Sequence, residues 1–160
     1  MKIYQASVKT PFGHLGLRFD EDRLAAIDFI DAETEVRPRD ESVAEVCALI
    51  RRYLDNAETV PSFNLPCALQ GTPFQQKVWN ELKKIPCGTV ITYGELANKL
   101  GTSARAIGNA CRKNPIPLVI PCHRVVAANG IGGYAGDTHG AWLRIKSWLL
   151  RHEGVAVASP

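Results

Sequence analysis

The spacing of apolar residues differs between the two halves of the chain, and this difference limits the fold more than any other feature. Up to residue 31, apolar and polar side chains alternate in three sets, separated by polar or turn-forming residues at Pro11–Gly13 and Asp20–Asp22. A period of two is typical of strands with one buried face. From Val43 to Leu54 the apolar residues recur at helical spacing, with Ser42 as the candidate N-cap. The first part therefore predicts a small antiparallel sheet followed by a helix.

The second half carries the signals of several short helices. Thr72–Gln75 and Thr92–Glu95 both have the pattern of a capping box, and Ser103 can cap a helix over residues 104–113. Gly101 lies between the last two helices, so this pair is a candidate helix-turn-helix. A final helix shows an apolar face made by Trp142, Ile145, Trp148 and Leu149.

Residues 55–71 contain prolines and a glycine and are typical of a connection between two lobes. We therefore expect an α+β protein with an N-terminal domain over residues 1–68, a C-terminal domain over residues 69–155 and a tail over residues 156–160. A chain of 160 residues that is 46% hydrophobic is long and apolar enough to bury such a core. No apolar run approaches the roughly 18–20 residues that a membrane span needs, so we expect no membrane partner.

The five cysteines lack the spacing of metal ligands or of a regular disulfide framework. Their number is odd, their gaps are long and no CxxC occurs. We expect reduced thiols, a cytoplasmic location and no metal site. The net charge of +3 permits a nucleic-acid partner without requiring one.

The segment Pro117–Val126 holds the strongest candidate for chemistry. Leu118–Ile120 is short and apolar, which predicts a buried strand, and Pro121 ends it. Cys122 then lies beside His123 and Arg124, where positive charge would favour the reactive thiolate. A cysteine that merely packs as a small hydrophobe is the alternative, because adjacent side chains need not meet.

Two neighbouring stretches also allow two interpretations. The helix over residues 104–113 combines small residues with cations, so it suits either close packing on the protein's own core or approach to a nucleic-acid groove. The segment 129–136 contains four glycines, which is typical of a loop that lets backbone approach a ligand, or of simple exposed turns.

Taken together, these segments resemble the O6-alkylguanine-DNA alkyltransferases, also called methylated-DNA–protein-cysteine methyltransferases. Pro121–Val125 is similar to the active-site signature of that family. The resemblance is strong over residues 71–154, whereas Thr10–Gly13 and the predicted meander are only loosely similar to the family's N-terminal domain. Further matching segments are Phe74–Trp79, Ile85–Gly88, Tyr93–Ala97, Ala104–Gly108, Asn114–Pro115 and Trp148–Gly154.

The resemblance implies a ribonuclease-H-like N-terminal sheet, a C-terminal winged helix-turn-helix and a DNA-repair reaction. Double-stranded DNA that contains O6-alkylguanine would be the partner, with O4-alkylthymine left open as a second substrate. The damaged base would be flipped into a pocket, and Cys122 would take the alkyl group irreversibly, once per molecule. No cofactor is implied, and we expect a monomer.

The family's functional residues carry over by position. Cys122 would be the acceptor, His123 the base acting through a water, Glu153 the carboxylate that orients His123, and Tyr93 a donor to the leaving guanine. Arg105 would fill the space left by the flipped base, and Asn114 would tie the recognition helix to the active-site turn. The implied DNA-binding set also includes Ala104, Ala106, Gly108 and Arg112. The implied pocket set is Pro117, Val125, Tyr134, Ala135 and Cys111.

Departures from the family pattern lie near the pocket rim. Residues 137–143 look like an insertion, and Cys111 stands where a bulkier apolar residue would narrow the site. Three alternatives remain: a helix-turn-helix regulator without chemistry, an alkyltransferase-like protein that binds damaged DNA without a nucleophile, and a Cys-His hydrolase. The Cys-His-Glu set argues against the regulator. The presence of Cys122 separates this chain from the alkyltransferase-like proteins, and a hydrolase would need sustained turnover.

Overall fold

The computed structural model describes residues 3–30, 35–132 and 140–157, and it places an antiparallel sheet at the start of the chain. Strands β1 (Ala6–Thr10), β2 (Gly13–Asp20) and β3 (Arg23–Ile30) pair in the order β1-β2-β3. Leu17 of β2 lies opposite both Ala6 and Ile27, and all three side chains are buried. The alternating pattern therefore predicted the three strands.

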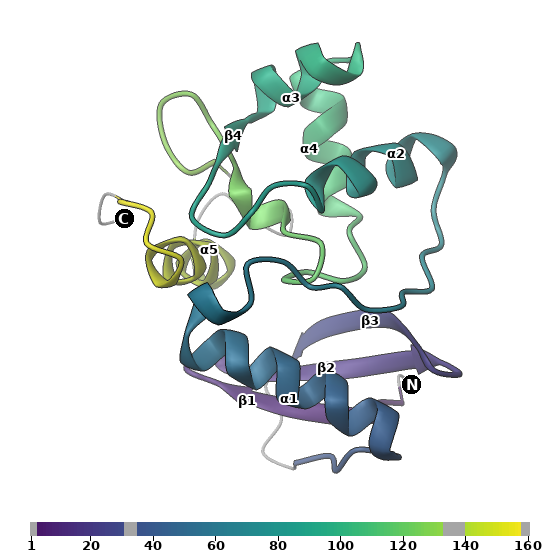
Figure 1. Cartoon of the computed structure of the whole chain (residues 1–160). Helices are drawn as coiled ribbons and strands as arrows, with labels where there is room; N and C mark the ends of the chain where they lie inside the picture. The colour runs from purple at the N-terminus through teal and green to yellow at the C-terminus, as the bar shows by residue number, and fades with distance from the viewer. Residues whose placement is uncertain (1–2, 31–34, 133–139, 158–160) are drawn as a thin grey trace.

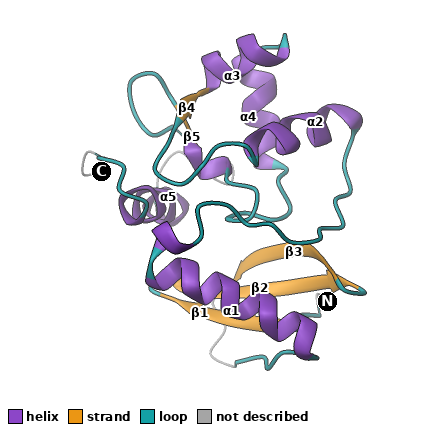
Figure 2. Ribbon diagram, in the orientation of Figure 1, coloured by secondary structure: helices purple, strands orange, loops and turns teal. Residues whose placement is uncertain are grey.

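Helix α1 (Glu41–Asp55) packs along this sheet, as Figures 1 and 2 show. Its N-cap is Asp40 rather than the expected Ser42, because the Asp40 carboxylate accepts the Val43 amide at 3.0 Å. The Ser42 hydroxyl instead donates to Asp40. A short 3-10 turn, η1 (Ala57–Thr59), follows α1 and begins the connection to the second half.

The second half gathers three helices, α2 (Pro73–Leu82), α3 (Tyr93–Leu100) and α4 (Ala104–Arg112). Both expected capping boxes are present, at the starts of α2 and α3, and Ser103 caps α4. Gly101 ends α3 with a φ of 67°, a left-handed conformation that glycine adopts without strain. The indole Nε1 of Trp79 donates to the Ala110 carbonyl at 2.9 Å, which fixes α2 against α4.

The predicted strand at Leu118–Ile120 was wrong. This segment is a buried turn in which Leu118 has a φ of 75° and the Ile120 amide donates to the Ile116 carbonyl at 2.9 Å. Extended backbone cannot continue through a positive φ, so the apolar run folds back on itself. A 3-10 turn, η2 (Cys122–Arg124), comes next, and β5 (Val125–Val126) then pairs in parallel with β4 (Ile91–Thr92).

Helix α5 (Ala141–His152) completes the fold and contacts η2; in the view of Figure 1 it lies at one side, at a level between the sheet and the group α2–α4. Buried residues from both halves form one hydrophobic cluster. Backbone bonds also join the halves, since the Ile27 amide in β3 donates to the Pro115 carbonyl at 2.9 Å. The protein thus combines helices with a small three-stranded antiparallel sheet. Among the described ranges, no helix is long and apolar enough to cross a membrane.

Candidate active site

Cys122 begins the η2 turn and is only 7% exposed. Asn114, just after α4, holds the chain that leads to it. The Asn114 Nδ2 donates to the Ile120 carbonyl at 2.8 Å, while its Oδ1 accepts the Ile116 amide at 2.9 Å. One side chain therefore braces both ends of the buried turn and connects it to α4, which fits the tying role expected for Asn114.

His123 points away from solvent toward the end of α5. Its Nε2 lies 2.7 Å from Oε2 of Glu153, and both side chains have no exposed surface. A carboxylate only accepts, so Nε2 carries the proton and Nδ1 is the free acceptor nitrogen. Nδ1 has no hydrogen-bond partner among the protein atoms of the described ranges. The geometry therefore leaves one basic nitrogen available in a buried site.

Arg124 holds the same carboxylate from a second direction. Its Nε donates to Oε1 of Glu153 at 2.8 Å and its Nη2 to Oε2 at 3.0 Å, while Nη1 donates to the Ile85 carbonyl at 2.6 Å. This two-pronged contact is the strong geometry for an arginine and a carboxylate. Glu153 is therefore a buried, fully paired anion and not a solvated charge at a helix end.

The charges of the pair follow from this packing. Burial opposes the ionisation of Glu153, but the contacts with His123 and Arg124 outweigh it and hold the pKa of Glu153 well below its ordinary value. Burial lowers the pKa of His123, and the partial compensation by Glu153 does not restore it. At neutral pH the site thus combines an ionised carboxylate with a neutral imidazole.

Lys146 on α5 is a functional candidate that sequence reasoning missed. It is fully buried, its Nζ donates to the Val125 carbonyl at 2.8 Å, and the ammonium lies 5.7 Å from the centre of the Tyr93 ring. Burial lowers the pKa of Lys146 to about 8, against the opposing pull of Cys122 and Cys111. Its sequence signal was the presence of a cation on the apolar face of the last helix.

The Cys122 thiol feels opposing effects. Burial raises its pKa, while the Asn114 side chain and the Lys146 charge lower it. The net effect is a raised pKa of Cys122, so the thiol is protonated at rest.

Tyr93, the first residue of α3, is near both Cys122 and Cys111. Burial, followed by these two thiols, raises the pKa of the Tyr93 hydroxyl, which therefore remains a proton donor.

The residues expected to contact DNA are Tyr93 of α3 and a set on two faces of α4. Tyr93, Ala104, Arg105 and Gly108 line one open hollow of about 530 Å³, together with Ala127 and Ala128 beyond β5. Ala106 and Arg112 line a different hollow, toward the start of α2. A Cβ built on Gly108 would meet nothing within 4 Å. The absence of a side chain at Gly108 is therefore not required by packing on the protein's own core.

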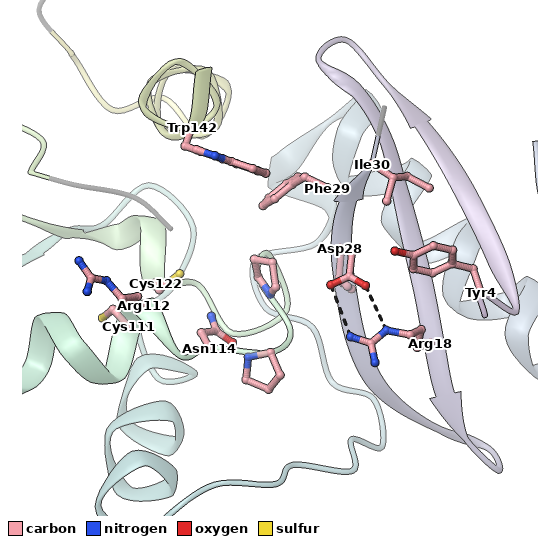
Figure 3. A pocket seen from close by; sticks show the side chains of 13 residues that line it. Tyr4, Arg18, Asp28, Phe29, Ile30, Cys111, Arg112, Asn114, Cys122 and Trp142 are labelled. Carbon is pink, nitrogen blue, oxygen red and sulfur yellow. Dashed lines mark hydrogen bonds and ion pairs between the residues drawn. The ribbon is translucent and has the colours of Figure 1, made fainter. Parts of the chain in front are cut away.

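A second cavity, of about 330 Å³, reaches Cys122 from the side of the sheet. Figure 3 shows Cys111, Arg112 and Cys122 on one side and the Arg18–Asp28 pair of β2 and β3 on the other. Arg18 and Asp28 are held together at 3.0 Å. Asn114, Pro117 and Trp142 also line this space. Two of the expected pocket residues, Cys111 and Pro117, therefore line the same cavity as Cys122.

The other expected pocket residues are placed less directly. Val125 is fully buried in β5, where its carbonyl receives Lys146. Tyr134 and Ala135 lie outside the described residues, as do residues 137–139 of the apparent insertion at 137–143. At Gly132, where φ is 74°, an added Cβ would lie 2.9 Å from the Tyr93 ring, so the described start of the glycine-rich segment packs against Tyr93. Within the described ranges, no cluster of three His, Cys, Asp or Glu side chains could hold a metal ion.

Comparison with known proteins places this site in a family. Residues 73–155 match the model of the 6-O-methylguanine DNA methyltransferase DNA-binding domain. The chain is 37% identical to a methylated-DNA–protein-cysteine methyltransferase of Shigella flexneri, over 96% of this chain and 97% of that one. The chain belongs to the 6-O-methylguanine DNA methyltransferase family.

Other methyltransferases of this family extend the similarity to archaea and to solved structures. The Saccharolobus solfataricus methylated-DNA–protein-cysteine methyltransferase is 38% identical over 93% of this chain and 94% of that one. The crystal structure of the Mycobacterium tuberculosis O6-methylguanine methyltransferase is 30% identical, with a TM-score of 0.79 over 98% of this chain and 96% of that one. The structure of M. tuberculosis OGT in complex with DNA has a TM-score of 0.78 at 31% identity, over 95% and 93%. The similarity therefore includes the sheet half, where the sequence alone was least informative.

Proposed function

We propose that this protein repairs DNA by direct reversal, by moving the alkyl group of O6-alkylguanine onto Cys122. The observation that carries the proposal is the buried His123–Glu153 pair beside Cys122, at 2.7 Å, in a chain that belongs to a DNA methyltransferase family. The names of its relatives as methylated-DNA–protein-cysteine methyltransferases support the same reaction.

The residues suggest the following transfer. The Cys122 proton passes to the free Nδ1 of His123 through a water, and Glu153 and Arg124 hold the ring in the orientation that keeps Nδ1 available. The thiolate sulfur then forms a bond to the alkyl carbon, and the bond from that carbon to guanine O6 breaks. The electron pair stays on the guanine, where Tyr93 donates a hydrogen bond to the developing negative charge.

This transfer gives a thioether on Cys122 and, once the guanine anion takes up one proton in place of the one that Cys122 lost, an unmodified guanine. A carbon–sulfur bond of this kind has no ready leaving group that would restore the thiol, so each molecule reacts once. The reaction needs no cofactor, because the sulfur supplies both electrons of the new bond.

The face of α4 that carries Ala104, Arg105 and Gly108 would meet double-stranded DNA. Open space at Gly108 and the exposed Arg105 guanidinium support close approach to a groove and to the phosphates. A base inside a duplex must leave the stack to reach a buried thiol, and the unstacking costs a few kcal/mol. Arg105 would occupy the space left by that base. Ala106 and Arg112, on the other face of α4, would contribute through flanking contacts.

The flipped base would lie between Cys122 and Tyr93. The pocket walls would be Pro117, Val125 and Cys111, together with Tyr134 and Ala135, which lie outside the described residues.

We propose domain limits at residues 1–68 and 69–155, with a ribonuclease-H-like N-terminal sheet, a winged C-terminal helix-turn-helix and a tail at 156–160. The protein would act as a cytoplasmic monomer, in keeping with cysteines that are all free thiols.

Intact mass spectrometry tests the reaction. Incubation with a duplex that contains one O6-methylguanine should add one methyl group to the wild-type chain and none to Cys122→Ser. The Cys67→Ser variant removes a free thiol outside the pocket, so it is the matched control and should still gain the methyl. DNA binding without any mass gain would indicate a non-catalytic protein that binds alkylated DNA, and would contradict the proposal.

A further inference from the structure

A tyrosine from the N-terminal half reaches the buried carboxylate of the site. The hydroxyl of Tyr53, on α1, donates to Oε2 of Glu153 at 2.5 Å, across 100 positions of sequence. The Tyr53 side chain is fully buried. Oε2 of Glu153, which accepts the Tyr53 hydroxyl, also accepts the hydrogen bond from Nε2 of His123. The two donors therefore share one acceptor atom.

The Tyr53 ring is fixed on more than one side. It lies at 5.4 Å from the Phe63 ring and at 5.3 Å, edge to face, from the His152 ring. The Tyr53 carbonyl also lies 2.6 Å from Nε2 of His152, at the end of α5. This packing leaves the hydroxyl little freedom, so the donor is held in position before any substrate binds.

The charges around Glu153 explain why an additional donor matters. Arg124 and His123, both in η2, contact the Glu153 carboxylate directly. Lys146 of α5 acts on His123 through its charge, from a greater distance. Cys87, in the connection between α2 and β4, lies near Glu153. Each hydrogen bond that Glu153 accepts stabilises its negative charge. The carboxylate then stabilises the positively charged, doubly protonated form of His123 less. The donors therefore decide how strongly His123 holds a second proton.

We propose that Tyr53 is a positioning residue of the transfer reaction, which fixes Glu153 and keeps His123 in the neutral form that accepts the Cys122 proton. The inference rests on the proposed function, because it assigns Tyr53 a task within that relay. Burial, followed by the Glu153 charge, raises the pKa of the Tyr53 hydroxyl, so Tyr53 remains a donor throughout the working range.

The proposal also gives the N-terminal half a task in catalysis. Tyr53 has no place in the segments that resemble the family signature, and it sits on a helix whose pattern predicts only packing. Through Tyr53, helix α1 contacts the Glu153 carboxylate, which His123 and Arg124 of η2 also contact. The sheet half is then part of the active site and not only a support for it.

The pH dependence of the reaction tests this role. The second-order rate constant for methyl transfer from a duplex with one O6-methylguanine is measured from about pH 5.5 to about pH 9, where histidine and thiol groups titrate. The Tyr53→Phe variant keeps the ring and removes the donor. Without the Tyr53 donor, Glu153 stabilises the protonated form of His123 more strongly, so the pKa of His123 rises. The acid limb of the profile should therefore move to higher pH by about half a unit to one unit. The rate at the acid end should fall roughly threefold to tenfold and recover toward alkaline pH.

A matched control separates this effect from simple destabilisation. Ser7→Ala removes another buried hydroxyl of the N-terminal half, one that accepts the Val36 amide at 2.8 Å without contacting Glu153. Its profile should keep the wild-type pH midpoint. All profiles are recorded below the unfolding temperature of each variant, and far-ultraviolet circular dichroism checks the fold.

Two outcomes would overturn the inference in different ways. A Tyr53→Phe profile that is uniformly lowered, with an unchanged midpoint, would show that the hydroxyl only stabilises the fold. If the wild-type protein itself transfers no methyl group, the proposed function fails first and the inference fails with it. A shifted midpoint in Tyr53→Phe alone supports the role of Tyr53.

Discussion

At the scale of single residues, Glu153 sets the electrostatics of the site. It accepts hydrogen bonds from His123, Arg124 and Tyr53 in a place without exposed side-chain surface. A buried carboxylate with such partners is stable only while it is ionised. Its protonation is therefore linked to the stability of the whole fold.

The pH dependence of stability follows from the lowered pKa of Glu153. The folded protein holds this carboxyl ionised to lower pH than the unfolded chain does, whose ordinary value is 4.5. The stabilisation is thus fully present above about pH 4.5 and is lost as the pH falls below it, because the unfolded state then binds more protons. Urea unfolding of the wild type between pH 7 and pH 3 should show this decline.

The Glu153→Gln variant should remove that dependence and lower the free energy of unfolding by roughly 3–5 kcal/mol, since Arg124 is left buried without its anion. The comparison variant is Glu81→Gln, which breaks contacts to the exposed Lys84 and Lys99 and should cost about 1 kcal/mol or less. Equal losses for the two variants would contradict the account of Glu153.

Residue-level prediction from sequence named candidates only where a side chain lies inside a recognisable segment. Cys122, His123 and Asn114 are such residues, and their roles stay predictions; the structure adds the contacts of His123 with Glu153 and of Asn114 with Ile120. Tyr53 and Lys146 were missed because their roles depend on contacts between distant elements. Nothing in the local pattern around Tyr53 distinguishes it from an ordinary core tyrosine.

At the scale of secondary structure, α4 presents an exposed face that packs on no other part of the described chain at Gly108. Ala104, Arg105 and Gly108 line an open hollow with Tyr93, and the space beside Gly108 is empty of protein. If Arg105 replaces the flipped base, its loss should affect only substrates that must leave a duplex.

The Arg105→Ala variant should therefore react with the free base O6-benzylguanine at the wild-type rate, while its reaction with duplex DNA falls by about tenfold or more. Arg51→Ala is the charge-matched control, because Arg51 is exposed on α1 and outside the proposed DNA-binding face. This control should leave both rates unchanged. Equal losses on the free base and the duplex would rule out the flipping role of Arg105.

Local signals predicted most elements, and they failed where a tertiary contact decides the backbone. The capping boxes at Thr72 and Thr92 mark the starts of α2 and α3 because both partners of each box are close in sequence. Leu118–Ile120 reads as a strand, yet Asn114 braces it as a turn with a positive φ at Leu118. A leucine in that conformation is uncommon, and no local pattern indicates it.

At the scale of the whole molecule, the two halves meet at the reaction centre. One hydrophobic core spans both halves. The Ile27 amide of β3 donates a hydrogen bond to the Pro115 carbonyl, and the Tyr53 hydroxyl contacts the Glu153 carboxylate that orients His123. The cavity that reaches Cys122 is likewise lined by both halves (Figure 3). The N-terminal half forms no sequence motif of its own, so sequence reasoning placed no candidate site residue in it.

The stoichiometry of repair tests the central claim most directly. The protein is incubated with an excess of duplex that contains O6-methylguanine, and the restored guanine is counted against the protein while the peptide that bears Cys122 is analysed by mass spectrometry. We predict a plateau at one restored guanine per protein molecule, with the methyl group on Cys122. A yield that keeps rising beyond one per molecule, or a methyl group found on Cys111 instead, would contradict the account.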